Sequence, residues 1–308
     1  MRVDHGRPLE FGISVAPEAA NLPTIRTLVR AADEHGIDLI GIQDHPYQWR
    51  FLDTMALIGQ LLAETSRVRI FADVANLPLR HPAMLAKEAA SLDVLSKGRY
   101  ELGIGIGSFW DAIVAMGGPR RRPGEAVEAL EEAIAIIRSA WSGERSVRVR
   151  GRHYVVDGYH PGPLPVHDME IWVGAYRPRM LRLTGRLADG WIPSLGQIDL
   201  DALADGQRRI DEAAGRAGRD PSAIRRMLNF GGSTGPSAGE SGIRFGPSTG
   251  LRGSVDEWVD RLSGWATELG LDTFILWPTI PESGQVETFG RVIAAQTRTE
   301  VARRRSSA

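Results

Sequence analysis

The most informative absence in this sequence is cysteine. None of the 308 residues is a cysteine, so disulfide bonds, thiolate metal sites and thiol nucleophiles are excluded together. Lysine is almost absent as well, because Lys87 and Lys97 are the only two in the chain. Arginine therefore supplies nearly all of the positive charge, and any anion site in the second half of the chain must be built from arginines or backbone N–H groups.

A charge imbalance and long apolar runs are also missing. The chain has 37 basic and 38 acidic residues, a formal net charge of −1, which gives no electrostatic reason to expect a nucleic acid or an anionic membrane as partner. No stretch approaches the roughly 20 apolar residues that cross a bilayer, and the N-terminus lacks a basic segment followed by an apolar run. We therefore expect a cytoplasmic protein that acts on a small molecule.

The residues that are present alternate between two periodicities. Short apolar, β-branched runs are followed by longer segments of helical period almost from end to end, the pattern of repeated βα units around a parallel sheet. The expected strand and helix of each unit are 11–15 and 22–35, 36–43 and 53–64, 68–74 and a helix opened by Pro82, 100–106 and 124–141, 170–175 and 178–188, 190–194 and 200–217, 226–232 and 255–269, and 272–278 and 285–297. Eight such units predict a single TIM-barrel domain over residues 1–308.

Two segments interrupt this alternation. Residues 146–165, "SVRVRGRHYVVDGYHPGPLP", are predicted to form a hairpin excursion before the fifth strand. Residues 231–253 form a long loop rich in Gly, Ser and Pro after the seventh strand. A loop of that length exceeds what a connection needs, so it is more typical of a functional or mobile segment.

Polar residues gather where the second strand ends, in "QDHPYQWR" at 43–50. Active sites of TIM barrels lie at the carboxyl ends of the strands, so Asp44 and His45 are predicted to lie over the barrel mouth. An equally simple interpretation is structural: Asp44 could satisfy backbone donors while His45 packs against Trp49.

The next two strands also end in unusual residues. Asp73 lies inside the apolar third strand, and "GIGIGSFWD" ends the fourth with alternating glycines. Such glycines let a flat ligand approach the backbone, although barrels also use them beside bulky neighbours. Their position at the strand ends favours the functional interpretation.

The fifth unit, "VGAYRPRML", has the features of an anion site. Gly174 and Ala175 end the strand, and Arg177 and Arg179 flank the proline that opens the next helix. The first N–H groups of a helix can bind phosphate, and cations at that end oppose the helix dipole unless an anion compensates them. The alternative is that both arginines are only solvated helix-start residues.

Together, "QDHPYQWR", "ANLPLRHPAMLAKEAASLDVLSKGRYELGIGIG" and "GAYRPRMLRLTGRLADGWIP" resemble the luciferase-like flavin and deazaflavin oxidoreductases. The resemblance extends from the first strand to the eighth and implies a barrel that holds FMN or the deazaflavin coenzyme F420 in its mouth. The Asp-His pair followed by Trp and Arg is closer to the F420-dependent oxidoreductases than to the FMN monooxygenases.

The resemblance also implies roles for individual residues. His45 would be the acid or base beside the reactive ring, and a cis peptide bond at Asp73–Val74 would back that ring. The residues implied to bind the coenzyme or its tail are Asp44, Asp73, Val74, Asn76, Ile106, Gly107, Ser108, Gly174, Ala175, Tyr176, Arg177, Arg179 and Met180.

One position departs from the family pattern. In the sugar-phosphate dehydrogenase branch a glutamate follows the glycine of the fourth strand and donates a proton, whereas this chain has Ser108, whose hydroxyl is too weakly acidic to replace it. The lysines of that branch's phosphate clamp have no counterpart either. We therefore expect an apolar or heterocyclic substrate rather than a sugar phosphate, framed by Tyr47, Trp49, Phe109 and Trp110, although these aromatic residues could equally be core packing.

The predicted activity is hydride transfer between coenzyme F420 and an unidentified small organic molecule, in a direction that the sequence leaves open. Two other functions remain possible: an FMN-dependent luciferase-like monooxygenase, and a coenzyme-binding barrel without catalysis. A metal-dependent hydrolase is not predicted, because the seven histidines do not gather at strand ends. The resemblance implies a homodimer.

Overall fold

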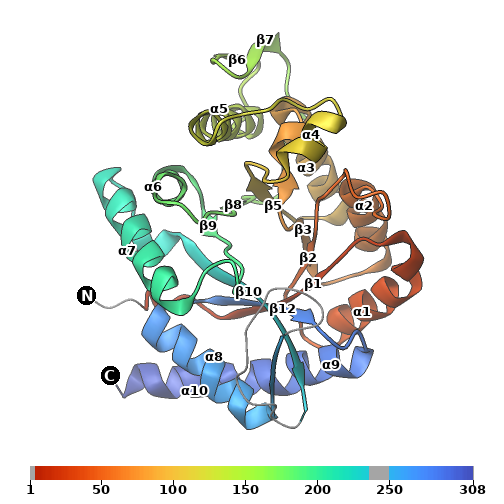
Figure 1. Ribbon diagram of the computed structural model, residues 1–308, viewed down its shortest axis with the longest axis vertical. Helices are drawn as coiled ribbons and strands as arrows, with labels where there is room; N and C mark the ends of the chain where they lie inside the picture. The colour runs from red at the N-terminus through yellow and green to blue at the C-terminus, as the bar shows by residue number, and fades with distance from the viewer. Residues whose placement is uncertain (1–3, 236–249, 308) are drawn as a thin grey trace.

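A closed barrel of parallel strands forms the centre of the protein (Figure 1). The computed structural model describes residues 4–235 and 250–307. The barrel strands are β1 (Glu10–Val15), β2 (Leu39–Ile42), β3 (Arg69–Ala72) with its continuation β4 (Ala75–Asn76), β5 (Tyr100–Gly105), β8 (Ile171–Val173), β9 (Gly190–Trp191), β10 (Arg225–Thr234) and β12 (Thr273–Pro278). Each pairs in parallel with its neighbours, and the pairs β12–β1 and β9–β10 close the cylinder, so the predicted TIM barrel is confirmed.

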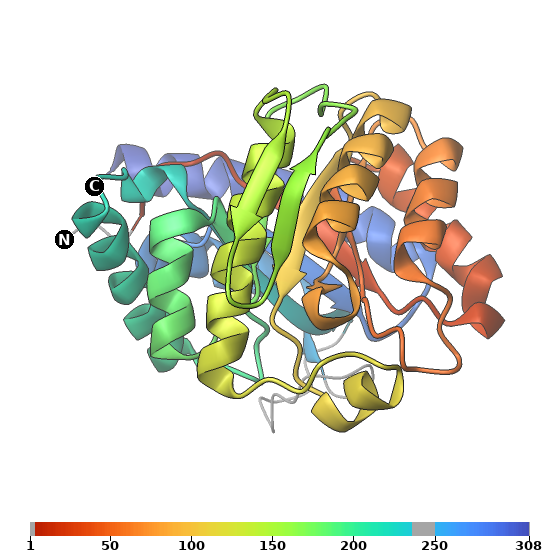
Figure 2. The same cartoon turned by 90° about the horizontal axis from the view of Figure 1, so that it is seen from above.

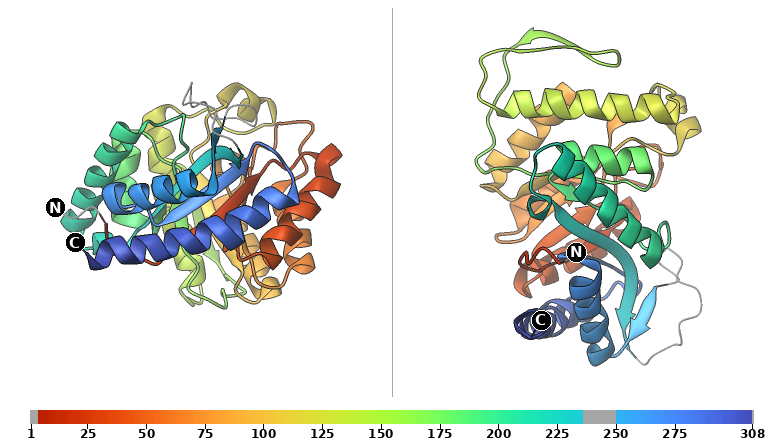
Figure 3. Two further views of the ribbon diagram at one scale, coloured as in Figure 1. Left: turned by 90° about the horizontal axis from the view of Figure 1, so that it is seen from below. Right: turned by 90° about the vertical axis from the view of Figure 1, so that its left-hand side faces the viewer.

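Helices surround the barrel on its outer side (Figures 1 and 3). They are α1 (Leu22–Glu34), α2 (Thr54–Glu64), α3 (Pro82–Ser96), α4 (Trp110–Ala115), α5 (Pro123–Trp141), α6 (Pro178–Leu187), α7 (Leu200–Arg216), α8 (Val255–Leu269), α9 (Ser283–Glu287), the π-helical turn η4 (Thr288–Ala294) and α10 (Ala295–Ser306). Prolines open α3, α5 and α6, where a missing N–H costs little. The Asp53 carboxylate caps α2 by accepting the N–H of Ala56.

Two helices differ from the prediction. The last helix extends to Ser306, nine residues beyond the predicted end at Thr297, because Thr297 and Val301 still bury one narrow side of an otherwise polar sequence. The connection after β5 was expected to be a loop, yet it contains the short helix α4 at the carboxyl end of the strands (Figure 2). A six-residue helix is too short for its periodicity to be recognised in the sequence.

The inside of the barrel is filled below its mouth. Leu39, Phe71, Trp172, Ile192, Met227 and Ile275 form a separate buried cluster, and the rings of Phe71 and Trp172 meet edge to face with centroids 4.9 Å apart. The larger hydrophobic core lies between the strands and the helices. Because the interior is packed below, open space for a ligand lies at the mouth.

The third strand breaks where the resemblance places a special peptide. The bond Asp73–Val74 is cis, as expected, and the chain resumes as β4, which pairs with β5. The Val74 side chain turns toward the barrel interior, where an added Cβ at Gly105 would lie 2.7 Å from its Cγ2. The glycines of β5 were expected to admit a flat ligand; instead, Gly103 and Gly105 admit Phe71 and Val74.

The predicted hairpin is confirmed as β6 (Val147–Arg150) and β7 (Val155–Tyr159), an antiparallel pair outside α5 (Figure 3). The Glu132 carboxylate on α5 accepts three successive backbone N–H groups of the hairpin turn, from residues 152 to 154. After the seventh barrel strand, β10 continues to Thr234 and pairs with β11 (Leu251–Gly253). The middle of the predicted loop, residues 236–249, lies outside the described residues.

The close packing beside Gly103 generates a stability prediction. A methyl group at this position would overlap the carbonyl oxygen of Ala72 and press on Val74, so Gly103→Ala should lower the free energy of unfolding by about 2 kcal/mol or more. Gly215→Ala is the matched control, because this exposed glycine of α7 has no atom within 4 Å of an added Cβ. The control should be neutral or stabilising by up to about 1 kcal/mol. Urea unfolding measures both, and equal effects would contradict the packing argument.

Candidate active site

A cavity of about 610 Å³ opens at the carboxyl ends of the barrel strands. Residues from the ends of β2, β4, β5, β8, β9, β10 and β12 and from the starts of α6 and α7 line it. Most residues predicted to form the site meet here: Asp44, His45, Tyr47, Asp73, Val74, Asn76, Ile106, Gly107, Ser108, Gly174, Tyr176, Arg177 and Met180.

The Asp44 carboxylate is the centre of a buried ion pair. Its two oxygens accept Nε and Nη2 of Arg80 at 2.7 and 2.8 Å, and the backbone N–H of Asn76 at 2.8 Å. The Arg80 side chain also donates to Asp53, the cap of α2. The pair thereby ties the loop after β2 to β4 and to the start of α3. Asp44 was expected to bind the coenzyme, whereas in this arrangement its oxygens hold the walls of the cavity together.

His45 lies beside Asp44 and faces Tyr47. The Nδ1 atom of His45 is 2.8 Å from the hydroxyl of Tyr47, and the ring of Phe109 stands edge-on to the imidazole at 5.7 Å. Burial lowers the pKa of His45, and the Asp44 carboxylate opposes this shift only in part. The imidazole is therefore mostly neutral near pH 7 and can accept a proton.

The floor of the cavity is polar as well as apolar. Asp73 accepts Nδ2 of Asn229 at 3.1 Å and the hydroxyl of Ser14 at 3.3 Å, while Val74 covers the packed interior. Although the Asp73 side chain is partly exposed to the cavity, it is far from bulk water. Burial raises its pKa to about 6, against the two hydrogen bonds, which lower it.

Two buried acceptors in this cavity have no partner within the described part of the chain. The Oδ1 atoms of Asn76 and Asn229 are inaccessible to solvent and make no hydrogen bond, and both residues are at most 5% exposed. A buried amide oxygen without a donor is costly, so these atoms indicate a ligand that offers N–H groups. A flavin or deazaflavin ring offers such a group on its pyrimidine edge, and the residues present therefore fit this coenzyme type.

The start of α6 borders the cavity on another side. Arg177 is the residue before the helix and lines the cavity, and the hydroxyl of Tyr176 accepts the backbone N–H of Ser194 at 3.1 Å. Arg179 does not line the cavity; its guanidinium donates to Glu128 on α5 at 3.0 Å. The predicted pair of arginines is thus divided, and Arg177 alone faces the ligand space.

Other predicted residues also lie outside the cavity lining. Ala175 is buried, and its carbonyl oxygen accepts the indole N–H of Trp191. The Trp49 side chain is 84% exposed, and Arg50 stacks on its ring, so it does not pack against His45. Phe109 borders the cavity only through its ring contacts with His45 and Tyr47, and Trp110 begins α4. This placement does not support the predicted four-residue aromatic frame.

Several site residues were missed at the sequence level. The second half of the barrel contributes Ile192, Ser194, Gln197, Ile198, Asp199, Ala202, Asn229 and Trp277, and the loop after β2 contributes Gln43. Asn229 had a recognisable signal, because an amide inside an apolar strand is as unusual as the carboxylate of Asp73. Nothing in the sequence distinguished Arg80 from the other arginines, since its role depends on a partner 36 residues away.

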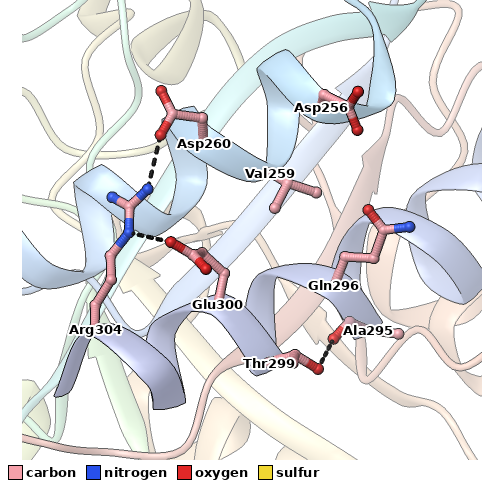
Figure 4. Close-up of a pocket in the computed structure, with 8 residues that line it drawn as sticks. All are labelled: Asp256, Val259, Asp260, Ala295, Gln296, Thr299, Glu300 and Arg304. Carbon is pink, nitrogen blue, oxygen red and sulfur yellow. Dashed lines mark hydrogen bonds and ion pairs between the residues drawn. The ribbon is translucent and has the colours of Figure 1, made fainter. Parts of the chain in front are cut away.

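A second hollow, of about 500 Å³, lies between α8 and α10 on the outer side of the barrel (Figure 4). Arg304 bridges Glu300 and Asp260 there, which accounts for the charged residues as an ion-pair network between two helices. Among residues 4–235 and 250–307, no three His, Asp or Glu side chains are grouped to hold a metal ion. None of the helices in these ranges has the length and apolar composition that crossing a bilayer requires.

A closed parallel barrel with buried acceptors and an arginine around one large cavity at the strand ends defines a TIM-barrel protein that binds a sizeable planar ligand. The family model described as luciferase-like monooxygenase matches residues 6–240. The chain belongs to this family.

Curated relatives narrow the comparison. A protein named F420-dependent glucose-6-phosphate dehydrogenase from Nakamurella multipartita is 31% identical over 223 residues, which cover 67% of this chain and 65% of the relative. A protein of the same name from Kineococcus radiotolerans is 32% identical over 73% of this chain and 69% of the relative. A phthiodiolone/phenolphthiodiolone dimycocerosates ketoreductase from Mycobacterium bovis is 36% identical over 52% of this chain and 41% of the relative.

Solved structures share the fold. An F420-dependent secondary alcohol dehydrogenase in complex with an F420-acetone adduct superposes with a TM-score of 0.81 at 17% identity, covering 94% of this chain and 99% of that one. The F420-dependent tetrahydromethanopterin reductase of Methanopyrus kandleri has a TM-score of 0.79 at 18% identity, covering 94% and 100%.

The buried pair at Asp44 generates the second prediction. Arg80→Gln leaves the Asp44 carboxylate buried without its cation and should lower the free energy of unfolding by about 3 kcal/mol or more. Arg179→Gln is the matched control, because it breaks an exposed pair with Glu128 and should cost less than about 1 kcal/mol. Urea unfolding compares the two variants.

A double variant keeps this test decisive even if Arg80→Gln fails to fold. Asp44→Asn combined with Arg80→Gln leaves no charge buried, so the double variant should be more stable than Arg80→Gln alone. A double variant that is less stable than the single one, or equal losses in Arg80→Gln and Arg179→Gln, would contradict the assigned role of the pair.

Proposed function

We propose that the protein is a coenzyme F420-dependent oxidoreductase that transfers a hydride between the deazaflavin ring and an uncharged small organic substrate. The observation that carries this proposal is the meeting of His45, the unpartnered oxygens of Asn76 and Asn229, and Arg177 around one cavity. The names of the relatives at 31 and 32% identity support F420 as the coenzyme.

In this proposal the cavity walls divide the work of binding. Val74 supports the ring from below, and the amide oxygens of Asn76 and Asn229 accept ring N–H groups. Arg177 and the free N–H groups at the start of α6 bind the phosphate of the tail, since both the guanidinium and the helix dipole attract an anion. Ile106, Gly107, Ser108, Tyr176 and Met180 complete the lining around the coenzyme.

The bound coenzyme supplies the hydride chemistry, and the protein supplies orientation and a proton. A neutral His45 can accept the proton of an alcohol as that alcohol is oxidised, and its protonated form can donate to a carbonyl oxygen as the carbonyl is reduced. Asp44 remains with Arg80 throughout, which keeps the loop that carries His45 in place. Either reaction direction uses the same residue.

The proposed substrate carries no phosphate, unlike the one in the names of the dehydrogenase relatives. Arg177 is the only cationic side chain that lines the cavity within the described residues, and the coenzyme phosphate engages it. The other nearby arginines, Arg80 and Arg179, are already paired with carboxylates. Ser108 is exposed and cannot donate a proton as an acid would, so His45 is the proton-transfer group of the site.

Coenzyme titration tests this proposal directly. The purified apoprotein should bind F420 more tightly than FMN, as measured by fluorescence, and Arg177→Gln should weaken F420 binding about tenfold or more through loss of a charge-assisted contact. Arg182→Gln is the control, because this exposed arginine of α6 does not line the cavity. Tight FMN binding without F420 binding would instead support a luciferase-like monooxygenase.

Replacement of His45 tests catalysis separately from binding. His45→Asn should reduce turnover about 100-fold or more while F420 affinity stays within about twofold, because the proton donor is lost but the binding groups remain. Turnover is measured by F420 absorbance with a panel of uncharged ketones and secondary alcohols. His160→Asn, on the exposed hairpin connection, should leave the rate unchanged. Coenzyme binding with no turnover of any panel member would support a non-catalytic carrier.

Assembly and location are proposed on family resemblance alone. The protein is proposed to form a homodimer and to reside in the cytoplasm. No partner chain contributes to the cavity as described above, so the proposed reaction does not depend on the dimer.

A further inference from the structure

The hydroxyl of Tyr47 is the hydrogen-bond partner of the proposed catalytic imidazole. It lies 2.8 Å from Nδ1 of His45, and both residues line the cavity. The ring of Phe109 packs against both, with centroids 5.7 Å from the imidazole and 5.8 Å from the phenol. The two polar groups are therefore held against each other by a third side chain from the loop after β5.

Local sequence explains why these two residues meet. They are separated only by Pro46, whose ring fixes φ, and the backbone N–H of Gln48 donates to the carbonyl oxygen of His45 at 2.9 Å, closing a turn. A turn over residues 45–48 brings the side chain of Tyr47 back over the imidazole. The contact is thus built into a short, stiff segment instead of depending on a long flexible side chain.

A phenol hydroxyl suits this position because it can both donate and accept. When the imidazole is neutral with its proton on Nε2, the hydroxyl donates to Nδ1; when the imidazole is charged, Nδ1–H donates to the hydroxyl oxygen. The same contact therefore serves both protonation states of His45. In both states Nδ1 is occupied, and Nε2 is the nitrogen left to exchange a proton with a substrate.

The surroundings keep the two groups in these states. Burial raises the pKa of Tyr47 to about 12, with the Asp44 charge contributing, so the hydroxyl stays protonated at any ordinary pH. The charged groups facing His45 are Asp44 and, behind it, Arg80, which pairs with Asp44, Asp53 and Glu88; Asp73 lies on the cavity floor. None of these carboxylates is within hydrogen-bond distance of the imidazole, so Tyr47 is its polar partner among the described residues.

We propose that Tyr47 is a positioning residue that holds the His45 ring through Nδ1 and so reserves Nε2 for proton exchange with the substrate oxygen. This inference rests on the proposed function for the role of His45. It also accounts for the working of the site with Ser108 in place of an acid. The proton then passes through one nitrogen of defined orientation, and no second carboxylate is needed.

Nitrogen-15 NMR of the histidine rings in the apoprotein tests the hydrogen bond itself, without coenzyme or substrate. Wild type and Tyr47→Phe are labelled at histidine, and His45→Asn identifies the His45 signals. In wild type the neutral ring should carry its proton on Nε2. In Tyr47→Phe the two tautomers should mix, and the pKa of His45 should fall further, because the charged ring loses the acceptor for Nδ1–H.

Tyr159→Phe is the matched control, since it removes a hydroxyl from β7 of the hairpin, outside the cavity. Its His45 signals should equal those of wild type. Identical His45 tautomer and pKa in wild type and Tyr47→Phe would overturn the proposal, whatever coenzyme the protein binds. That outcome is distinguishable from failure of the proposed function, which would appear as absent F420 binding with the NMR result intact.

Turnover adds a second readout on any substrate found in the panel above. Tyr47→Phe should lower kcat about tenfold while KM and F420 affinity stay within about twofold, and the acidic limb of the kcat/KM profile should move to lower pH. A loss confined to F420 affinity would overturn the positioning role and make Tyr47 a binding residue.

Discussion

The ion pair between Asp44 and Arg80 is the interaction on which the rest of the site depends. It joins the loop after β2 to the segment between β4 and α3, and its carboxylate also accepts the N–H of Asn76. His45 follows Asp44 directly, and Asn76 presents its unpartnered amide oxygen to the cavity. A single buried contact therefore sets the relative position of the proposed proton donor and of one proposed coenzyme ligand. Because both oxygens of the carboxylate are occupied, this rigidity is obtained without leaving a buried charge unsatisfied.

The cavity combines a supporting side and a reacting side. The third strand breaks at Asp73–Val74, and the glycines of β5 make room for the Val74 side chain that the break turns inward. Asn229 reaches the same floor from the opposite side of the barrel and bonds to Asp73. His45, Tyr47 and Phe109 form the reacting side, at the edge where a substrate would enter. Such a division suits a redox coenzyme that must be held firmly while its partner exchanges.

The outcome for individual residues shows which patterns in the sequence were reliable. The cluster at 43–50 led to the site because the barrel rule assigns every strand end to one mouth. The same rule was less informative about direction: Trp49 and Arg179 belong to the right segments, yet their side chains turn to solvent and to Glu128. The glycines of β5 were recognised as places of close approach, but what approaches is Val74. Asn229 and Arg80 were missed because their partners lie 156 and 36 residues away in the chain.

The sequence by itself determined the barrel, the order of its strands, the hairpin, and the segments that end at the mouth. These features follow from local periodicity, turn residues and connection rules, which act over short stretches of chain. Only the tertiary structure decided which carboxylate is neutralised by which arginine, which amide oxygens are left without donors, and which imidazole nitrogen is already occupied. Those properties depend on distances between side chains from different strands, and a repeat of eight similar units does not specify them until the cylinder has closed.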